Sequence, residues 1–269
     1  MKKFTTQVRA DVLKMIHNAK SGHPGGALSS VDILAVLYKK VMNVPPEWDK
    51  SPKFKERDRF ILSKGHASTA LYATLAHLGF FDKKLLMGFR TLGSKLQGHP
   101  SSRTNLPGIE VSTGSLGQGL SIGVGIALAL RLDKSKSKVF VLMGDGEMQE
   151  GSVWESLMNA NAKKLDNLIV IIDKNNLQID GAVQDVKTLE PLDKKLEAFG
   201  FKVYSIDGHN FEEIEKTLTE AKKSSKLCAI IANTVKGKGV SFMENNVSWH
   251  GKAPKDEDLK LALEELNVK

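Results

Sequence analysis

The 269-residue chain has very little cysteine and lacks any long hydrophobic run. Its single cysteine, Cys228, excludes an internal disulfide, and its place in the apolar run 227–232 predicts a buried strand residue. No stretch reaches the roughly 20 apolar residues that cross a membrane. The first residues, 1–5, lead into a mixed-charge helical pattern, which argues against a secretory signal. We therefore expect a cytoplasmic protein without membrane contact.

The chain also lacks a basic stripe with interleaved aromatic residues, although its net charge is +8. Lysine and arginine alternate with acidic residues, as in residues 53–59. This pattern argues against a nucleic-acid partner, for which clustered positive charge is expected. A basic surface could instead attract phosphorylated substrates over a distance.

Several common nucleotide, metal and hydrolase motifs are missing. The dinucleotide spacing fails because Ile122 stands at the third glycine position after Gly117 and Gly119. A phosphate-binding Walker loop fails because Lys238 is followed by Gly239 rather than by serine or threonine. Cysteine–histidine zinc spacing and the G-x-S-x-G nucleophile elbow are absent, while composition alone leaves a Ser–His–Asp triad open.

Two short apolar runs, 139–142 and 168–172, are rich in β-branched residues and predict parallel strands buried on both faces. Residues 151–162 between them have helical spacing, so the unit is strand, helix, strand. Asp145 and Asn175 follow the two strands and should meet at the carboxyl edge of the sheet.

A carboxylate and an amide oxygen at one sheet edge can hold a hard divalent cation that keeps open positions for phosphate oxygens. Gly144 and Gly146 flank Asp145 and let the backbone approach a bulky anion closely. The sequence thus predicts a metal and phosphate site at this edge.

Helical and extended patterns alternate along the whole chain. Strands are also predicted at 59–62, 201–206 and 227–233. Helices are predicted at 5–19, 30–42, 67–78, 116–132, 189–198, 211–223 and 256–266. A turn at 21–26 and a proline-rich loop at 43–52 interrupt the pattern. The fold class is therefore α/β, with a mostly parallel sheet flanked by helices, and we expect one domain over 1–269.

Five of the seven histidines adjoin a glycine: His23, His66, His99, His209 and His250. A loop histidine beside glycine can point into a cleft, where a neutral imidazole can donate to or accept from the oxygens of a polyhydroxylated substrate. The alternative for each is an ordinary loop histidine bonded to backbone.

His17 and His77 fall inside helical patterns and are expected to be structural. The segment Gly114 to Gly117 begins the next helix, where free N–H groups favour an anion or a close ligand. Small residues at 117, 121 and 125 offer another interpretation, namely close packing of helices or subunits.

Together these residues resemble the amino-terminal half of transketolase, an enzyme that uses thiamine diphosphate (ThDP). The resemblance runs through nearly the whole chain. The matching motifs are Ser21-Gly22-His23-Pro24-Gly25, Leu62-Ser63-Lys64-Gly65-His66-Ala67, Gly98-His99-Pro100, Thr113-Gly114-Ser115-Leu116-Gly117-Gln118-Gly119, Gly144-Asp145-Gly146 with Glu150-Gly151, Asp173-Lys174-Asn175 and Ile179-Asp180-Gly181.

The resemblance implies specific roles at matching positions. Asp145, Asn175 and the Leu177 carbonyl would hold Mg²⁺ or Ca²⁺ against the diphosphate, which Gly146 and His250 would also approach. His66 and the turn Gly114-Ser115-Leu116 would lie along the cofactor. His23, His66 and His99 would face the donor ketose, and Glu150 would help connect two active sites across a dimer. Ser115 replaces the proline common in full-length transketolases.

The resemblance also implies a partner. One-chain transketolases continue into a pyrimidine-binding domain, whose glutamate activates the cofactor, and then into a C-terminal domain; this sequence ends at Lys269. We therefore expect the N-terminal subunit of a split transketolase, which pairs with a separate C-terminal subunit in a heterotetramer of two of each. The reaction implied is transfer of a two-carbon ketol unit from xylulose 5-phosphate to ribose 5-phosphate, as in the pentose phosphate pathway.

Other functions stay open at this point. The chain could belong to another ThDP enzyme of the same branch, such as a deoxyxylulose-phosphate synthase or a ketolase for an unusual sugar. It could also be a non-catalytic binding subunit that has kept the fold. The histidine set favours transketolase, and the retained metal ligands argue against a non-catalytic subunit.

Overall fold

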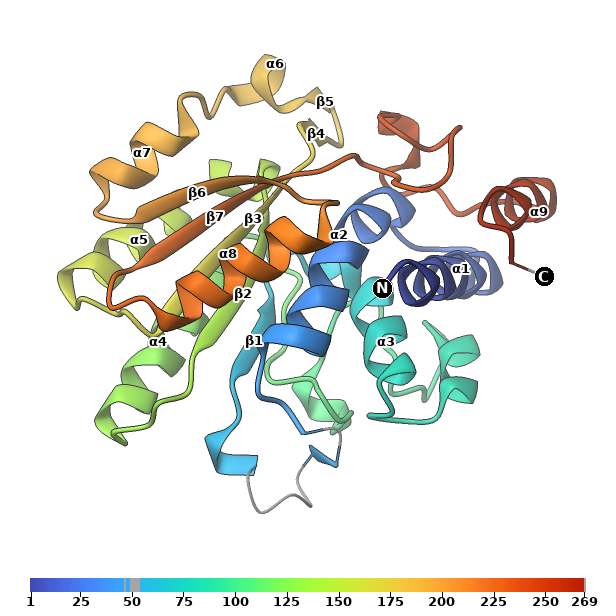
Figure 1. Ribbon diagram of the computed structural model, residues 1–269. Coiled ribbons are helices and arrows are strands. Elements are labelled where there is room, and N and C mark those ends of the chain that lie inside the picture. Colours follow the sequence, from blue (N-terminus) through green and yellow to red (C-terminus); the bar gives the residue numbers. More distant parts are fainter. Residues whose placement is uncertain (46, 49–53, 269) are drawn as a thin grey trace.

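A computed structural model describes residues 1–45, 47–48 and 54–268. Its centre is a five-stranded sheet in the order β1–β2–β3–β7–β6, in which every neighbouring pair is parallel (Figure 1). The strands are β1 (Arg59–Leu62), β2 (Val139–Gly144), β3 (Leu168–Lys174), β6 (Lys202–Asp207) and β7 (Cys228–Asn233). The α/β class with a parallel sheet is thus confirmed.

Helices cover both faces of this sheet (Figure 1). The helices are α1 (Lys2–Ala19), α2 (Pro24–Val36), α3 (Ser68–His77), α4 (Gln118–Leu132), α5 (Gly151–Ala162), α6 (Val183–Lys187), α7 (Leu192–Ala198), α8 (Phe211–Lys223) and α9 (Asp256–Glu265). Alternate side chains along β2 enter different apolar clusters. Phe140 and Leu142 pack with α1, α2, α3 and α8, whereas Val139 and Val141 pack with α4, α5 and α7. This alternation is what a central strand between two helical layers requires.

Helix α2 begins at Pro24, so the predictions of a turn over 21–26 and of a helix from residue 30 were wrong in their bounds. Pro24 occupies the first helical turn, where a missing N–H costs nothing. The glycines that suggested a turn lie inside the helix because neighbours approach closely. A Cβ on Gly25 would lie 3.0 Å from Lys236 Cγ, and one on Gly26 would lie 3.2 Å from His66 Nε2.

The connection after β3 contains structure that the sequence patterns did not indicate. A short antiparallel hairpin pairs β4 (Leu177–Gln178) with β5 (Gly181–Ala182), and α6 follows it. The expected helix at 189–198 begins only at Leu192. The predicted loop 43–52 falls partly outside the described residues.

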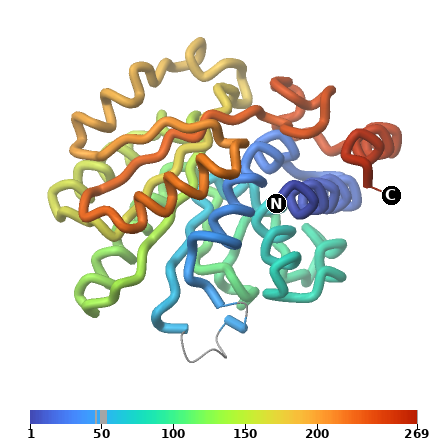
Figure 2. Tube along the Cα trace, viewed as in Figure 1, coloured from blue at the N-terminus to red at the C-terminus, as the bar shows by residue number. Residues whose placement is uncertain are grey.

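The two ends of the chain lie on the same side of the molecule (Figure 2). His17 of α1 binds Asp256 of α9 at 2.7 Å, and His77 of α3 binds Asp11 of α1 at 2.6 Å. These bonds between helices fit the structural role expected for both histidines. Among the described helices, none is both long and apolar enough to cross a membrane.

Candidate functional site

The strand-end pair expected from the sequence forms at the carboxyl edge of the sheet. Strands β2 and β3 are neighbours, with Gly144 opposite Asp173, so Asp145 and Asn175 follow adjacent strand ends. Both side chains are buried, at 2% and 5% exposure. The carboxylate of Asp145 accepts from the backbone N–H of Gly146 at 2.8 Å and from that of Asn176 at 2.5 Å.

Burial and the neighbouring charge of Asp173 raise the pKa of Asp145 to about 6, although its backbone donors and Lys64 act in the opposite direction. A buried carboxylate of this kind gains stability from a cation brought beside it. The charge distribution therefore favours a positively charged ligand at Asp145.

A buried ion pair lies below the same edge. Lys64 Nζ contacts the carboxylate of Asp173, which also accepts from the hydroxyls of Ser29, Ser30 and Thr234. Burial alone would raise the pKa of Asp173, but the Lys64 ammonium and the hydroxyls of Ser29 and Thr234 lower it. Because every partner is an ionic or hydrogen-bonding group, the buried pair is well satisfied. It fixes the end of β3, from which Asn175 projects.

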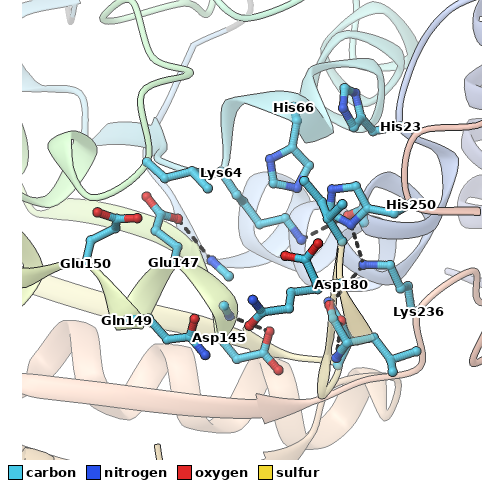
Figure 3. A pocket seen from close by; sticks show the side chains of 18 of the residues that line it. His23, Lys64, His66, Asp145, Glu147, Gln149, Glu150, Asp180, Lys236 and His250 are labelled. Atoms are coloured by element: carbon cyan, nitrogen blue, oxygen red, sulfur yellow. Dashed lines mark hydrogen bonds between the residues drawn. The ribbon is translucent and has the colours of Figure 1, made fainter. Parts of the chain in front are cut away.

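A cavity of about 330 Å³ opens above these strand ends (Figure 3). Its lining combines strand-end groups, loop histidines and two lysines. The lining residues are His23, Gly26, Lys64, His66, His99, Gly114, Leu116, Gly144, Asp145, Gly146, Glu147, Gln149, Glu150, Asn175, Leu177, Gln178, Ile179, Asp180, Lys236 and His250. The residues to which the resemblance gives a role all line it except Ser115, which is exposed.

Four glycine-flanked histidines gather in this cavity. The ring of His23 lies 5.4 Å from that of His66, 6.5 Å from that of His99 and 5.6 Å from that of His250. The fifth, His209, lies elsewhere, bound to Asp32 at 2.8 Å. The grouping shows that four of the five share one environment.

Burial lowers the pKa of each of the four clustered imidazoles. It lowers the pKa of His23 to about 4, assisted by Arg90, and that of His250 to about 3, assisted by Lys236. Burial is also the main cause that holds the pKa values of His66 and His99 below the usual range. Neutral imidazoles can both donate and accept hydrogen bonds, which suits sugar hydroxyls.

Two buried polar atoms at the cavity have no hydrogen-bond partner within the described residues, namely His23 Nδ1 and Gln178 Oε1. Unsatisfied buried polar atoms are costly and uncommon in folded proteins. Both residues line the cavity.

The sequence patterns missed Lys236, a buried lysine that faces the cavity (Figure 3). Its Nζ lies 3.0 Å from the carbonyl oxygen of Leu177 and 3.0 Å from His250 Nδ1. Burial and the charge of Lys64 lower its pKa to about 8. The only signal in the sequence is its glycine-rich surroundings, which do not fit the spacing of a Walker loop.

The oxygen atoms at this edge suit a hard cation. Asp145, Asn175 and the Leu177 carbonyl supply one carboxylate, one amide oxygen and one backbone oxygen. The Leu177 carbonyl already accepts a hydrogen bond from a cationic group, the Lys236 ammonium. Across the described residues no cluster of three or more histidine, cysteine or acidic side chains is arranged to hold a metal. A cation here would therefore need further oxygens from a ligand such as a diphosphate.

Glu147 ties the turn at 114–117 to the strand end, a role that no sequence motif indicated. Its buried carboxylate accepts from Gly117 N at 2.9 Å and from Gly144 N at 3.1 Å, and the hydroxyl of Ser63 donates to it. Gly114 has φ +139°, and a Cβ there would lie 2.9 Å from the ring of His99. These contacts hold the turn beside the cavity.

Comparison with known proteins places this geometry in a family. The family model described as "Transketolase, thiamine diphosphate binding domain" matches residues 1–269. An apulose-4-phosphate transketolase subunit from Actinobacillus succinogenes is 42% identical over 267 residues, which cover 99% of this chain and 95% of that protein. A 6-deoxy-6-sulfo-D-fructose transketolase subunit from a Clostridium species is 43% identical, with 96% and 93% covered.

A solved structure gives the same result. The crystal structure of transketolase from Campylobacter jejuni superimposes with a TM-score of 0.91 at 40% identity and covers all of this chain. This chain spans 43% of the length of that transketolase. The likeness therefore concerns one part of the longer enzyme.

Proposed function

The chain belongs to the transketolase family, matching its thiamine diphosphate-binding domain, and on that premise we propose that it is the N-terminal subunit of a two-chain transketolase. The observation that carries the proposal is a single cavity in which strand-end oxygens, two buried lysines and four neutral histidines meet. The two relatives named as transketolase subunits match it over 93–95% of their own length. In this proposal residues 1–269 form one ThDP-binding domain.

The cavity residues fit the polar end of ThDP. In the proposed complex Asp145, Asn175 and the Leu177 carbonyl hold Mg²⁺ or Ca²⁺, whose remaining positions take diphosphate oxygens. Lys236 and His250 meet the diphosphate directly, and the backbone at Gly144 and Gly146 leaves room for it. His66 and the turn Gly114-Ser115-Leu116 lie along the rest of the cofactor, with Glu150 at the rim.

The bound cofactor supplies the electron sink for cleaving and forming a carbon–carbon bond beside a ketone. This chain supplies binding and proton handling around it. His23, His66 and His99 would bond to hydroxyls of the donor ketose, and His66 would also lie along the cofactor. Because all three imidazoles are neutral, each can hold a proton at one ring nitrogen and accept at the other.

The experiment that tests this function compares the chain alone with the chain plus its C-terminal subunit. The chain alone should give no ketol transfer with ThDP, Mg²⁺, xylulose 5-phosphate and ribose 5-phosphate. Adding the partner should yield sedoheptulose 7-phosphate, and light scattering should show a heterotetramer of two subunits of each kind. Robust activity of this chain alone, in a preparation free of host transketolase, would contradict the two-chain proposal.

A second candidate differs only in substrate. The relatives at 42–43% identity are named for apulose 4-phosphate and 6-deoxy-6-sulfo-D-fructose. Their names favour testing these sugars as donors beside xylulose 5-phosphate and fructose 6-phosphate. A kcat/KM at least about tenfold higher for one of the unusual sugars would replace the pentose-phosphate assignment and leave the ketol-transfer chemistry intact.

A further inference from the structure

A buried charged group lies outside the cavity and connects three elements. The carboxylate of Asp32 in α2 accepts hydrogen bonds from both terminal nitrogens of Arg9 in α1, at 3.0 and 2.6 Å. The same carboxylate is hydrogen-bonded to Nδ1 of His209, which lies in the turn after β6, at 2.8 Å. The Asp32 and Arg9 side chains are 5% and 8% exposed. A bidentate ion pair this well buried holds its partners in fixed positions.

Both partners of Asp32, Arg9 and His209, also form hydrogen bonds with the loop that carries Lys236. The backbone N–H of Val235 donates to His209 Nε2 at 2.9 Å. The Nε of Arg9 donates to the carbonyl of Lys238 at 3.0 Å. The loop is thus held one residue before Lys236 and two residues after it.

These bonds determine the state of His209. Because Nε2 accepts a backbone N–H, the ring proton must reside on Nδ1, from which it is donated to Asp32. Asp32 therefore orients the imidazole, and the imidazole orients the backbone at Val235. The arrangement resembles the way in which outer carboxylates orient histidine ligands of metals.

The Lys236 backbone is also confined from the other side. Gly237 N donates to the Gly25 carbonyl at 3.0 Å, and a Cβ on Gly25 would lie 3.0 Å from Lys236 Cγ. Gly237 and Gly239 have φ of +79° and +98°. Such glycines leave a loop flexible unless other contacts restrain it.

We propose that the Arg9–Asp32–His209 group is a positioning device that presents the Lys236 ammonium to an anionic diphosphate in the cavity. This inference rests on the proposed cofactor site and adds residues lying outside the cavity. A lysine loses much rotational freedom on binding, so fixing its backbone beforehand raises its affinity for the anion.

Two substitutions of His209 separate positioning from simple packing. The amide of Asn in His209→Asn matches the place of Nδ1, so it keeps the bond to Asp32 and loses the bond to Val235. The amide of Gln in His209→Gln matches the place of Nε2, so its oxygen still accepts from Val235. Both variants are measured for hydrogen exchange of the 235–239 amides in the full chain. ThDP affinity with Mg²⁺ is measured by calorimetry in the complex with the C-terminal subunit.

We expect faster exchange at 235–239 and about tenfold weaker ThDP binding in His209→Asn, since one backbone hydrogen bond is lost. We expect His209→Gln to bind within about threefold of wild type. In a Lys236→Met background, His209→Asn should cause no further loss, because two substitutions acting through one contact are not additive. Arg9→Lys, which releases the Lys238 carbonyl, gives a second route if His209→Asn does not fold.

Equal losses in the Asn and Gln variants, or full additivity with Lys236→Met, would overturn the positioning role. Unchanged ThDP affinity in Lys236→Met would overturn it as well, by removing the contact through which it acts. None of these three results would touch the wider function, which depends on Asp145 and on ketol transfer by the assembled subunits; the last would remove only the proposed contact of Lys236 with the diphosphate.

Discussion

Lys236 Nζ lies 3.0 Å from the carbonyl oxygen of Leu177, an atom that the proposed cofactor site assigns to a metal. A lysine ammonium and a divalent cation cannot share this oxygen at close range without strong repulsion. Metal binding should therefore turn the ammonium away from Leu177 and towards the incoming diphosphate. The contacts of Val235 and Lys238 keep the Lys236 backbone in place while its side chain moves.

Asp145 should control metal-dependent cofactor binding, because it is the only anionic side chain in the proposed metal site. Asp145→Ala should weaken ThDP binding with Mg²⁺ by more than about tenfold in the assembled complex, as measured by calorimetry. The matched variant Asp145→Asn keeps the shape and tests the charge alone. Unchanged affinity in folded Asp145→Ala would remove the metal assignment.

The strand-end pair could be predicted from the sequence because its determinants are local. Each strand is a short β-branched run, the helix between them has a clear period, and a strand–helix–strand unit has a fixed hand. Asp145 and Asn175 therefore had to meet at one edge, as the pairing of Gly144 with Asp173 confirms.

Lys236 and His209 could not be predicted in the same way, because their roles depend on contacts between distant segments. Lys236 reaches Leu177 across 59 residues, and His209 reaches Asp32 across 177. His209 and His250 share the same local sequence feature, a neighbouring glycine, yet of the two only His250 faces the cavity. Local composition indicates that a side chain is free to point inwards and leaves its partner undetermined.

The clustered histidines should act on substrate rather than on folding. His23→Ala and His99→Ala should keep near-normal melting temperatures, because substitutions outside the packed core usually cost little stability. Turnover or donor affinity should fall by ~10²–10⁴, the usual range for lost proton transfer. His17→Ala is the matched control. The His17 ring joins α1 to Asp256 of α9 and does not line the cavity, so this substitution should leave turnover unchanged. Wild-type kinetics in both cavity variants would refute the assignment.

Two glycines of α4 should respond oppositely to alanine. A Cβ on Gly123 would lie 2.7 Å from Val141 of β2, so Gly123→Ala forces the helix away from the sheet and should destabilise the chain by about 1–3 kcal/mol. At Gly125 the added Cβ would point into open space, with no described atom within 4 Å apart from its chain neighbours and the backbone of its own helix. Gly125→Ala should therefore stabilise the chain by up to about 1 kcal/mol through helix propensity.

Urea unfolding of the two glycine variants provides the measurement. Light scattering of each variant mixed with the C-terminal subunit then tests whether this face is an interface. If Gly125→Ala stabilises the chain yet weakens assembly, the exposed glycine serves close packing between subunits. A destabilised Gly125→Ala would contradict the open space at this position.

His23 should make folding stability sensitive to acid. Its pKa is about 4 in the folded chain against 6.5 for the ordinary side chain, chiefly because of burial. Between these values the unfolded chain binds a proton that the folded chain does not, so stability falls as the pH falls from 6.5 towards 4. In His23→Asn the side chain does not titrate in this pH range, and asparagine can still cap the start of α2. Urea midpoints of wild type and variant should therefore differ by a constant amount above pH 7.5. Below pH 6.5 the wild type should lose stability relative to the variant, and a difference that stays constant from pH 8 to 4.5 would show that His23 titrates normally in the folded protein.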